Sequence, residues 1–588
     1  MTDQADPAEA AGVPERRIGV YICHCGGNIS DYVDVDAVRE ALRDEPGVVV
    51  AESPMFACAD GTQHDMIDDI DGEQLDGLVV ASCSPKLHQV TFRNMSKRAG
   101  LNPYAYTQVN IREQTSWAHT HDRAGATEKA ISLVRAGVAK TRLSVPLEPL
   151  VVQTRPRTLV VGGGIAGLRA AIGLADVGLD VVVVERDRRL GGWMGTFGAT
   201  YPTDEIGRDQ VAALVAEIEG RRDITTYVAA ELTGKSGSFG NYTAEITLHR
   251  ANGDKELHLE VGSIIVATGF DSYQPDAGEF GYGIDGVVTL PEFKTLVESG
   301  QGRLTRNGRQ VTSIAYVYCV GSRQEAPGNE YCSKFCCAAT LHESVQVSRR
   351  DPGVRQFHLH RDIRAYGRSE LLYAESRDLG STYLKFPDDD PPSVTTLPDG
   401  RLAVTVVDLL TSGRRLTLPV DLVVLVTGMV PRKNPGLSDL LKLPVGTDGF
   451  YNEIHPKLRP VETVVDGVLI AGCCQGPKTA GESVASGLAA VAQSAAILKK
   501  GYAELEPLVA TVDVEACTGC LSCLSSCPYS SITPISWEGR QVASIDASSC
   551  KGCGGCVPVC PDDAIDLLGY TDAQMRAAID ALVKEPVG

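Results

Sequence analysis

The sequence has fewer basic than acidic residues, and it lacks a long apolar run. Its 588 residues include 55 lysines and arginines but 75 aspartates and glutamates, which gives a formal net charge of −20. An acidic chain repels phosphates and anionic lipids, so nucleic acid and anionic membrane surfaces are not expected partners. No stretch of 18 residues is both apolar and free of charge, so we predict no membrane-spanning helix.

The first residues also lack the features of a secretory signal. "MTDQADPAEAAGVPERR" has neither a basic n-region nor an apolar h-region. Its composition is typical of a disordered segment, so we interpret residues 1–16 as a disordered lead-in. A cytoplasmic location is therefore the expectation.

Cysteine is absent between Cys83 and Cys319, and the 18 cysteines fall into clusters instead of being spread along the chain. Clustered cysteines in a chain without a secretory signal indicate metal sites more than structural disulfides.

The strongest pattern is a pair of cysteine runs near the end of the sequence. "CTGCLSCLSSCP" and "CKGCGGCVPVCP" share the C-x2-C-x2-C-x3-C-P spacing of two-cluster ferredoxins, in which the fourth cysteine of each run binds the other cluster. Thiolates are soft, charged ligands that suit iron. A zinc site or a degenerate remnant is the alternative. The predicted ligand sets of the two 4Fe–4S clusters are Cys517, Cys520, Cys523 and Cys560, and Cys550, Cys553, Cys556 and Cys527.

A glycine turn is the second pattern. Residues 162–167, "GGGIAG", contain GxGxxG between the apolar run "TLVVG" and a predicted helix, and Glu185 follows at the end of "VVVVE". Such glycines let the backbone approach a pyrophosphate, and the acid can hold ribose hydroxyls. Gly191 and the "ATG" that ends at Gly269 favour an FAD-binding fold over an NAD dehydrogenase. A doubly wound domain with a plain glycine turn is the alternative. The predicted FAD-binding residues are Gly162, Gly164, Gly167, Glu185, Arg186, Gly192, Thr268, Gly269 and Gly472.

The order of apolar runs predicts an α/β protein of several domains. Residues 17–145 form an α/β domain, and residues 146–500 form a thioredoxin-reductase-like FAD domain. A nucleotide-binding-like α/β subdomain interrupts the FAD domain at about 311–420. Residues 501–570 form the two-cluster ferredoxin domain, and residues 571–588 form a terminal helix.

Three cysteines crowd into "YCSKFCC", after an apolar run that ends near Cys319. A pyridine-nucleotide site would place GxGxxG at the end of that run, but the sequence reads "CVGSRQ". Vicinal cysteines rarely form a disulfide, and a pair four residues apart shares a face on a helix. Buried free thiols and a Cys332–Cys336 redox disulfide are the alternatives. The predicted ligands of a cluster beside the flavin are Cys319, Cys332, Cys336 and Cys337.

Four N-terminal cysteines lie at or shortly beyond the ends of the strand-like runs "IGVYIC", "GVVVA" and "LDGLVVASC". The carboxyl ends of parallel strands share one edge of a sheet, so these cysteines can converge. A zinc site or buried thiols are the alternative to a further cluster. The four predicted ligands are Cys23, Cys25, Cys58 and Cys83. By contrast, we interpret Cys473 and Cys474, in "AGCCQGP", as small packing residues.

With these motifs, the chain resembles the A subunit of heterodisulfide reductase, a family of iron–sulfur flavoproteins. "YICHCGGNISDYVDV", "VVASCSPKLHQVTFR" and "GLNPYAYTQVNIREQTSWAH" resemble its first domain, and "YCSKFCC" and "HRDIRAYG" its central region. The resemblance covers about residues 17–570. It implies FAD and clusters in the N-terminal domain, beside the flavin and in the ferredoxin module. It also implies B- and C-like subunits as partners, with a hydrogenase, formate dehydrogenase or ferredoxin as donor, and it is compatible with a homodimer.

Two departures from the family pattern refine this expectation. Long members carry a further ferredoxin inserted in the FAD domain, and the cysteine-free stretch between Cys83 and Cys319 excludes it here. Bifurcating members have a lysine near the flavin, five residues past the vicinal cysteines, and His342 stands there in this sequence. His342 is therefore the one catalytic candidate, because a histidine can hydrogen-bond the flavin or tune its potential.

The sequence thus predicts an electron-transfer subunit that passes electrons between FAD and 4Fe–4S clusters, and flavin-based bifurcation is one form of this activity. A self-contained NAD(P)H-dependent iron–sulfur flavoprotein is the first alternative. A non-catalytic cluster relay with an inert flavin fold is the second.

Overall fold

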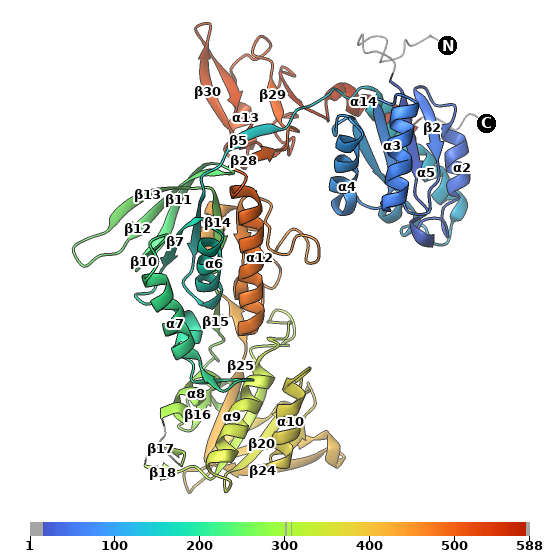
Figure 1. Ribbon diagram of the computed structural model, residues 1–588. Helices are drawn as coiled ribbons and strands as arrows, with labels where there is room; N and C mark the ends of the chain where they lie inside the picture. Colours follow the sequence, from blue (N-terminus) through green and yellow to red (C-terminus); the bar gives the residue numbers. More distant parts are fainter. Residues whose placement is uncertain (1–15, 300–302, 307, 584–588) are drawn as a thin grey trace. The chain divides into compact units, whose positions relative to one another are not determined.

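The computed structural model describes residues 16–299, 303–306 and 308–583, and it divides into two compact units (Figure 1). The first unit comprises the chain up to Val151 and the part from Glu504 onward, and the second comprises Val152–Ala503. The chain passes between them within β5 (Leu150–Gln153) and β28 (Tyr502–Leu505). Apart from residue 16, the predicted lead-in lies outside the described residues. None of the described helices has the length and apolar composition needed to cross a membrane.

The N-terminal part of the first unit is a parallel sheet of four strands in the order β2-β1-β3-β4. The central strands β1 and β3 are buried along their whole length, which explains why both read as continuous apolar runs. Because the strands are parallel, their carboxyl ends lie at one edge of the sheet. The strands are β1 (Ile18–Ile22), β2 (Val48–Glu52), β3 (Gly77–Ser82) and β4 (Tyr106–Asn110), and the helices are α2 (Val35–Leu42), α3 (Asp60–Gly72), α4 (Pro85–Arg98) and α5 (Arg123–Arg142).

The C-terminal part of the first unit consists of two small antiparallel ribbons, a short helix and a terminal helix. β29 (Ala510–Val512) pairs with β32 (Ile565–Leu567), and β30 (Ile532–Trp537) pairs with β31 (Arg540–Ile545). α13 (Ser522–Ser526) lies within the first cysteine run, and α14 (Asp572–Val583) packs against α5. The core between the ribbons is small and consists partly of cysteine side chains. A core of this kind depends on bound metal for much of its stability.

The second unit begins with a parallel sheet of five strands in the order β10-β7-β6-β14-β27. α6 and α12 lie side by side on one face, and the antiparallel strands β11–β13 cover the other (Figure 1). The parallel strands are β6 (Arg157–Val161), β7 (Asp180–Glu185), β10 (Ile224–Val228), β14 (Ser263–Val266) and β27 (Val468–Ile470). The covering elements are α6 (Ile165–Asp176), α7 (Gly207–Glu219), α12 (Ala480–Leu498), β11 (Ala230–Ser238), β12 (Asn241–Leu248), β13 (Lys255–Val261) and α11 (Pro435–Leu441).

A second subdomain repeats this plan with a parallel sheet in the order β16-β25-β19-β20-β21. Two of its strands, β16 and β25, lie outside residues 311–420, the range expected for the insert. The run "DLVVLVTG" forms β25, which pairs with β16 and β19 and not with the FAD-type sheet. β15 (Phe270–Ser272) and β26 (Met429–Pro431) pair where the chain enters and leaves this subdomain. Its elements are β16 (Val287–Thr289), β19 (Ser313–Val320), β20 (Arg355–His360), β21 (Thr382–Lys385), β25 (Leu422–Thr427), α8 (Leu290–Ser299), α9 (Cys336–Arg350), α10 (Ser369–Asp378), β22 (Ser393–Thr396), β23 (Leu402–Asp408) and β24 (Arg414–Val420).

A buried histidine lies in the core of the second subdomain. The ring of His358 stacks between Tyr316 and Tyr383, with ring centroids 4.7 and 4.5 Å away. Hydrogen bonds join its Nδ1 to the Tyr318 hydroxyl at 2.9 Å and its Nε2 to the Ser344 hydroxyl at 3.2 Å. Burial, with a smaller contribution from another histidine, lowers the pKa of His358 to about 3, so the ring is neutral in the folded protein.

This histidine makes the second subdomain less stable in acid. An unfolded chain binds a proton at His358 below pH 6.5, the ordinary pKa, whereas the folded chain stays neutral down to about pH 3. The full contribution to stability is therefore present above pH 6.5, and it falls by up to about 1.4 kcal/mol per pH unit as the pH drops. We expect hydrogen exchange in β19 and β20 to report this loss between pH 7.5 and 5.5. His358→Phe should flatten the pH dependence, while His258→Phe, at an exposed site on β13, should leave it unchanged. An equal pH dependence in wild type and His358→Phe would contradict this assignment.

Candidate cofactor sites

The glycines of the turn between β6 and α6 have different structural roles. Gly162 has a φ of +111°, and a Cβ there would collide with the carbonyl oxygen of Ala267. A Cβ at Gly167 would overlap the carbonyl oxygen of Gly162, so only glycine lets α6 approach β6 this closely. Gly164 has an extended backbone and free space around its missing side chain, and no side chain caps α6. The N-terminus of α6 is therefore open to an anion such as a pyrophosphate.

The acidic residue predicted to hold a ribose lies beside this turn. Glu185 ends β7 and is 8% exposed. Its carboxylate accepts hydrogen bonds from the backbone N–H of Gly163 at 2.6 Å and of Asp187 at 2.9 Å. These bonds fix its position and leave lone pairs for ligand hydroxyls.

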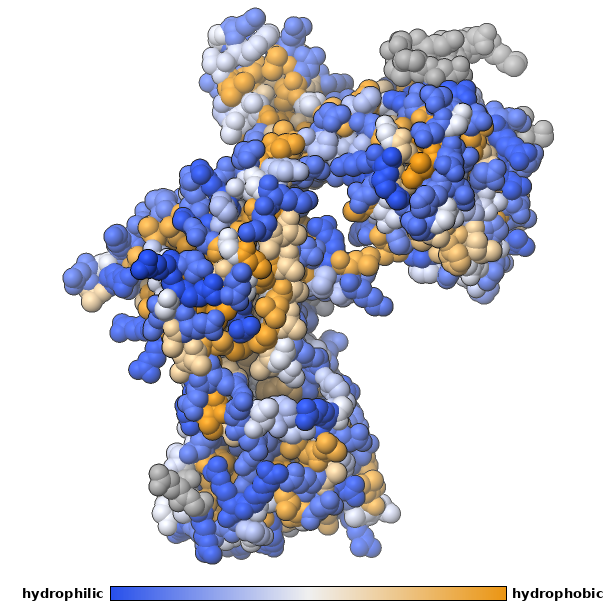
Figure 2. Space-filling view, in the orientation of Figure 1, coloured by the Kyte–Doolittle hydropathy of each residue, from blue (hydrophilic) through white to orange (hydrophobic). Residues whose placement is uncertain are grey.

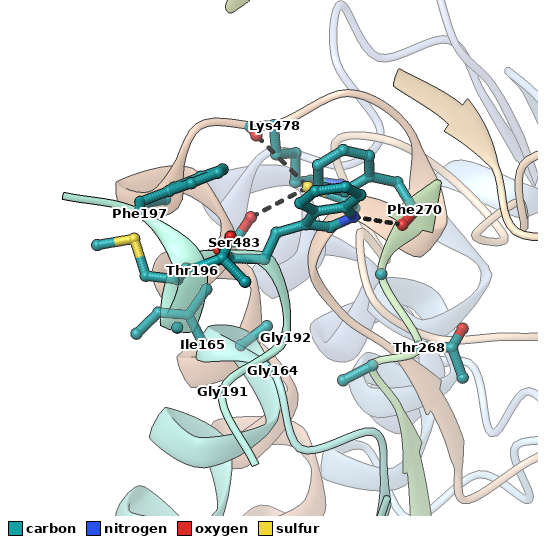
Figure 3. Close-up of a pocket in the computed structure, with 18 of the residues that line it drawn as sticks. Gly164, Ile165, Gly191, Gly192, Thr196, Phe197, Thr268, Phe270, Lys478 and Ser483 are labelled. Atoms are coloured by element: carbon teal, nitrogen blue, oxygen red, sulfur yellow. Dashed lines mark hydrogen bonds between the residues drawn. The ribbon is translucent and has the colours of Figure 1, made fainter. Parts of the chain in front are cut away.

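A cavity of about 530 Å³ opens where the glycine turn, the loop at Gly191 and the start of α12 meet (Figure 3). Trp193 and Phe270 form part of its wall, with stacked rings 5.8 Å apart, and the indole N–H donates to the Phe270 carbonyl at 3.1 Å. Two further cavities, of about 300 and 230 Å³, share lining residues with it. Adjoining cavities of these sizes suit an extended dinucleotide.

The predicted FAD residues distribute over these cavities. The 530 Å³ cavity is lined by Gly164, Glu185, Gly192, Thr268 and Gly269. The 300 Å³ cavity is lined by Gly162 and Arg186, and it shares Glu185 and Thr268. Gly167 and Gly472 line neither cavity and instead permit close packing, because a Cβ at Gly472 would crowd the side chain of Ala166.

His342 lines the 230 Å³ cavity together with Trp193, Phe270 and Phe335. It is 4% exposed, and its Nε2 hydrogen-bonds to a carboxylate oxygen of Asp204 at 2.7 Å. The Asp204 side chain is half exposed. The pair therefore joins the cavity to solvent through two groups that can carry a proton.

The four central cysteines converge at the end of β19 and the start of α9. Cys319 has a φ of +64°, which is uncommon for a residue other than glycine. The thiols are close enough to shift one another's ionisation: Cys319 interacts with Cys332 and Cys337, and Cys336 interacts with the other three. Burial raises the pKa of Cys319, and a hydrogen bond to Cys337 together with burial raises that of Cys336. Iron, which binds the thiolate, would displace these protons.

The prediction that Cys332 and Cys336 share a helical face is wrong. α9 begins only at Cys336, and Lys334, with a φ of +66°, turns the chain before the helix. Cys332 reaches the other thiols from this turn, where its Sγ accepts the Lys334 backbone N–H at 3.3 Å.

Three arginines that were not predicted from the sequence surround this quartet. Burial raises the pKa of Cys319, and the positive charges of Arg361 and Arg323 lower it in part. Arg323 and Arg364 likewise favour the thiolate of Cys337. Arg361 donates hydrogen bonds to the carbonyls of Arg323 and Ser322 at 2.8 and 3.1 Å, which fixes the group. "HRDIRAYG" contains two of these arginines, so the motif was visible although its role was not.

The strand end at Cys319 does not form a dinucleotide turn. Gly321 has a φ of +71°, and the ring of Tyr273 fills the space that a Cβ would occupy. The Tyr273 hydroxyl donates to a carboxylate oxygen of Glu279 at 2.9 Å, which holds the ring in place. α9 starts at Cys336, far beyond the end of β19 at Val320, so no short turn leads from this strand into a helix N-terminus.

The four N-terminal cysteines gather at the carboxyl edge of the four-stranded sheet. Cys23 and Cys83 directly follow β1 and β3, and electrostatic interactions link Cys83 to Cys23 and Cys25, and Cys23 to Cys58. Burial raises the pKa of Cys83 to about 11. The Sγ of Cys23 accepts the backbone N–H of Cys25 at 3.2 Å, and Arg112 donates to the Sγ of Cys25 at 3.5 Å. Such donors to sulfur suit an iron–sulfur site, whose potential they tune.

The eight C-terminal cysteines form two crossed groups, in which the fourth cysteine of each run lies with the first three of the other. Electrostatic interactions link Cys523 to Cys517, Cys520 and Cys560, and link Cys556 to Cys550, Cys553 and Cys527. Within the described residues, no three His, Cys, Asp or Glu side chains converge as ligands of a single metal ion. A four-iron cluster instead takes one thiolate per iron, so its ligands stand farther apart.

Comparisons with known proteins agree with these sites. The family described as "4Fe-4S dicluster domain" matches residues 510–567, and "NAD(P)-binding Rossmann-like domain" matches residues 160–209. The fold and the sites define an iron–sulfur flavoprotein oxidoreductase with an electron-transfer role.

Relatives along nearly the whole chain are more specific. The chain is 34% identical over 608 residues to the second iron–sulfur A subunit of CoB–CoM heterodisulfide reductase from Methanopyrus kandleri, covering 90% of this chain and 92% of the relative. It is 33% identical to the A subunit of the H2:CoB–CoM heterodisulfide, ferredoxin reductase from Methanothermobacter thermautotrophicus, with the same coverages, 90% and 92%. The chain belongs to the family of heterodisulfide reductase A subunits, which confirms the resemblance inferred from the motifs. Among solved structures, T. acidophilum thioredoxin reductase matches 58% of this chain and 97% of its own, at 13% identity and a TM-score of 0.40.

Proposed function

We propose that this chain is the electron-transfer subunit of a heterodisulfide-reductase-like complex, in which FAD exchanges electrons with 4Fe–4S clusters. One observation carries the proposal. Helix α9 begins with Cys336 and Cys337 and also carries His342, which lines the 230 Å³ cavity. Phe335, just before the helix, lines both the 230 Å³ and the 530 Å³ cavity. A cluster bound by the central quartet would therefore be connected to the proposed flavin site through a single helix, α9.

The proposed cofactor sites follow from this geometry. The glycine turn, Glu185 and the adjoining cavities would hold FAD, and the three cysteine groups would hold four clusters. Bound FAD accepts electrons in pairs, and each cluster passes them singly. The residues of this chain would position the flavin and set the potentials, whereas no side chain acts as a nucleophile.

The partners are proposed from the relatives' names. Relatives of this chain are named for H2, formate or ferredoxin as donors to a CoB–CoM heterodisulfide. We propose B- and C-like subunits and a hydrogenase, formate dehydrogenase or ferredoxin as partners, in the cytoplasm. Bifurcation is one form of the proposal, with His342 in the place of the family's lysine.

The experiment that tests the function is anaerobic mixing of the protein with candidate donors. We expect NADH and NADPH to leave the flavin absorbance unchanged over seconds, because the ring of Tyr273 fills the turn at Gly321. Reduced ferredoxin should bleach the flavin and the clusters together. Rapid bleaching by NADPH would favour a self-contained NAD(P)H oxidoreductase instead. Protein that binds clusters but no FAD would favour the relay.

The pair His342 and Asp204 is proposed to deliver protons when electrons reach the flavin from clusters, which carry no protons. We expect His342→Phe to slow flavin reduction by reduced ferredoxin about 100-fold, the range for one acid–base group, with cluster reduction unaffected. Asp204→Asn should have a smaller effect in the same direction. Stopped-flow traces in H2O and D2O would measure both. Unchanged flavin rates in His342→Phe would remove the histidine from the mechanism.

A further inference from the structure

A lysine that the motifs did not identify lines the 530 Å³ cavity. Lys478 directly precedes Thr479, the N-cap of α12 (Figure 3). Its Nζ donates to the carbonyl of Gly472 and to the Gln475 side-chain oxygen, both at 3.1 Å. An ammonium group has three N–H donors, so these two bonds hold the charge in place and leave one donor for the cavity.

Among the described residues Lys478 has no ionic partner, in contrast to Arg432 and Lys294, which also line these cavities. Arg432 pairs with Asp271 at 2.9 Å, and Lys294 pairs with Glu343. The two carboxylates that interact with Lys478 electrostatically have other partners. Glu453 accepts from the Gln475 amide at 3.3 Å, and Glu482 pairs with Lys334 and caps α12.

The protein therefore keeps a charge in a partly buried place without a fixed counter-charge. Burial is the main influence on Lys478 and lowers its pKa, because the ammonium group loses solvation there. The opposing influence of the Glu453 and Glu482 carboxylates is smaller. An unpaired charge of this kind is costly unless a ligand supplies the opposite charge. The occupant of the cavity must thus bring or develop a negative charge near Lys478.

Two parts of a bound FAD can carry negative charge, the pyrophosphate and the reduced flavin ring, and they would lie at different ends of the cavity. The glycine turn provides the anion site for the pyrophosphate. In Figure 3, Gly164 and Gly191 lie toward one end of the cavity, and Lys478 and Phe270 lie toward the other. Phe270 belongs to the aromatic wall that suits the ring system. Figure 2 shows the surface of the molecule in the orientation of Figure 1, with hydrophilic and hydrophobic residues interspersed.

We propose that Lys478 stabilises the negative charge that the flavin ring gains on reduction, and so raises the ring's reduction potential. The inference rests on the proposed FAD site. The step balances as two electrons, delivered one at a time by clusters, and one proton from solvent, which together convert the neutral oxidised ring into a reduced ring of charge −1. Lys478 is held in place before this charge appears, so its stabilising effect applies to the reduced form and not to the oxidised form.

The test compares Lys478→Met, Lys478→Gln and Lys478→Arg by anaerobic redox titration of bound FAD and by titration of the apo-protein with oxidised FAD. The neutral variants should lower the affinity for reduced relative to oxidised FAD at least tenfold, which for two electrons is about 30 mV in potential. They should bind oxidised FAD within a few-fold of wild type. Lys478→Arg should keep the wild-type potential, and so should Lys500→Met, which removes an exposed charge just beyond the other end of α12.

The outcomes separate the two proposals. FAD bound at unchanged potential in both neutral variants overturns the role of Lys478. An equal loss of affinity for oxidised and reduced FAD also overturns it, because Lys478 would then serve the pyrophosphate. Wild-type protein that binds no FAD refutes the proposed function itself. Circular dichroism identifies a variant that has failed to fold. If one neutral variant does not fold, the potential measured for the other decides whether Lys478 has the proposed role.

Discussion

Anaerobically purified protein is expected to contain about 16 iron atoms per FAD, and the double variant Cys336→Ser/Cys337→Ser about 12, at four per cluster. The reason is the convergence of four thiols at β19 and α9, where burial raises the pKa of Cys319 and three arginines supply positive charge. A hydroxyl replaces each thiolate poorly as a ligand of iron. Iron analysis with FAD released by denaturation measures the ratio.

The chain offers a matched control for this variant. Cys473 and Cys474 are also vicinal and buried, but they lie at the strand end after β27, where their sulfur atoms hydrogen-bond to protein oxygens. Cys473→Ser/Cys474→Ser should keep all the iron. Cys23→Ser/Cys25→Ser should lose the iron of a different cluster. About eight iron atoms in wild type, unchanged by any of these substitutions, would leave clusters only in the ferredoxin domain.

Gly164→Val should remove FAD while leaving the iron content and the fold intact. The backbone of Gly164 is extended and no atom lies within 4 Å of its would-be Cβ, so valine fits without strain. Its methyl groups would instead occupy the space in front of the α6 N-terminus, where the pyrophosphate is expected. We expect the affinity for FAD to fall at least 100-fold, about 2.8 kcal/mol by the conversion of 1.4 kcal/mol per tenfold.

Two other glycines distinguish a site effect from a folding effect. Gly61→Val, at a helix position of the other unit that also has no atom within 4 Å, should leave FAD binding unchanged. Gly167→Ala should reduce the thermal stability of the second unit, because its Cβ would overlap the carbonyl of Gly162. Isothermal titration of the apo-protein with FAD gives the affinities. Full FAD binding by Gly164→Val would mean that the pyrophosphate lies elsewhere.

The parts that the sequence predicted well depend on short-range spacing. Ligands three or four residues apart define a ferredoxin motif by themselves, and the turn at 162–167 is recognisable because glycine alone tolerates its backbone and its close contacts. The α/β architecture follows from apolar runs that stay buried on both faces of parallel strands. The family resemblance rests on the same local motifs.

The parts that the sequence missed depend on long-range contacts. Arg323 and Arg361 reach the quartet from segments 38 residues apart, and only the pairing of β19 with β20 brings them together. Lys478 is notable because it lacks a partner, which a sequence does not reveal. Strand β25 lies just beyond the range predicted for the insert, because its apolar run, considered alone, suits either sheet. The helical face shared by Cys332 and Cys336 assumed a helix that the turn at Lys334 prevents.

The contact between Gly321 and Tyr273 also limits which substitutions could create a nucleotide site in this subdomain. In this arrangement, a tyrosine ring has taken the space beside a glycine, and the neighbouring cysteine carries a backbone geometry that glycine would normally supply. Removing the ring alone would open a hole without creating a phosphate cradle, and rebuilding the turn alone would strike the ring. Building a pyridine-nucleotide site here would therefore require both changes at once. At this strand end, the occupied space and the backbone of Cys319 together exclude the turn that a pyridine nucleotide needs.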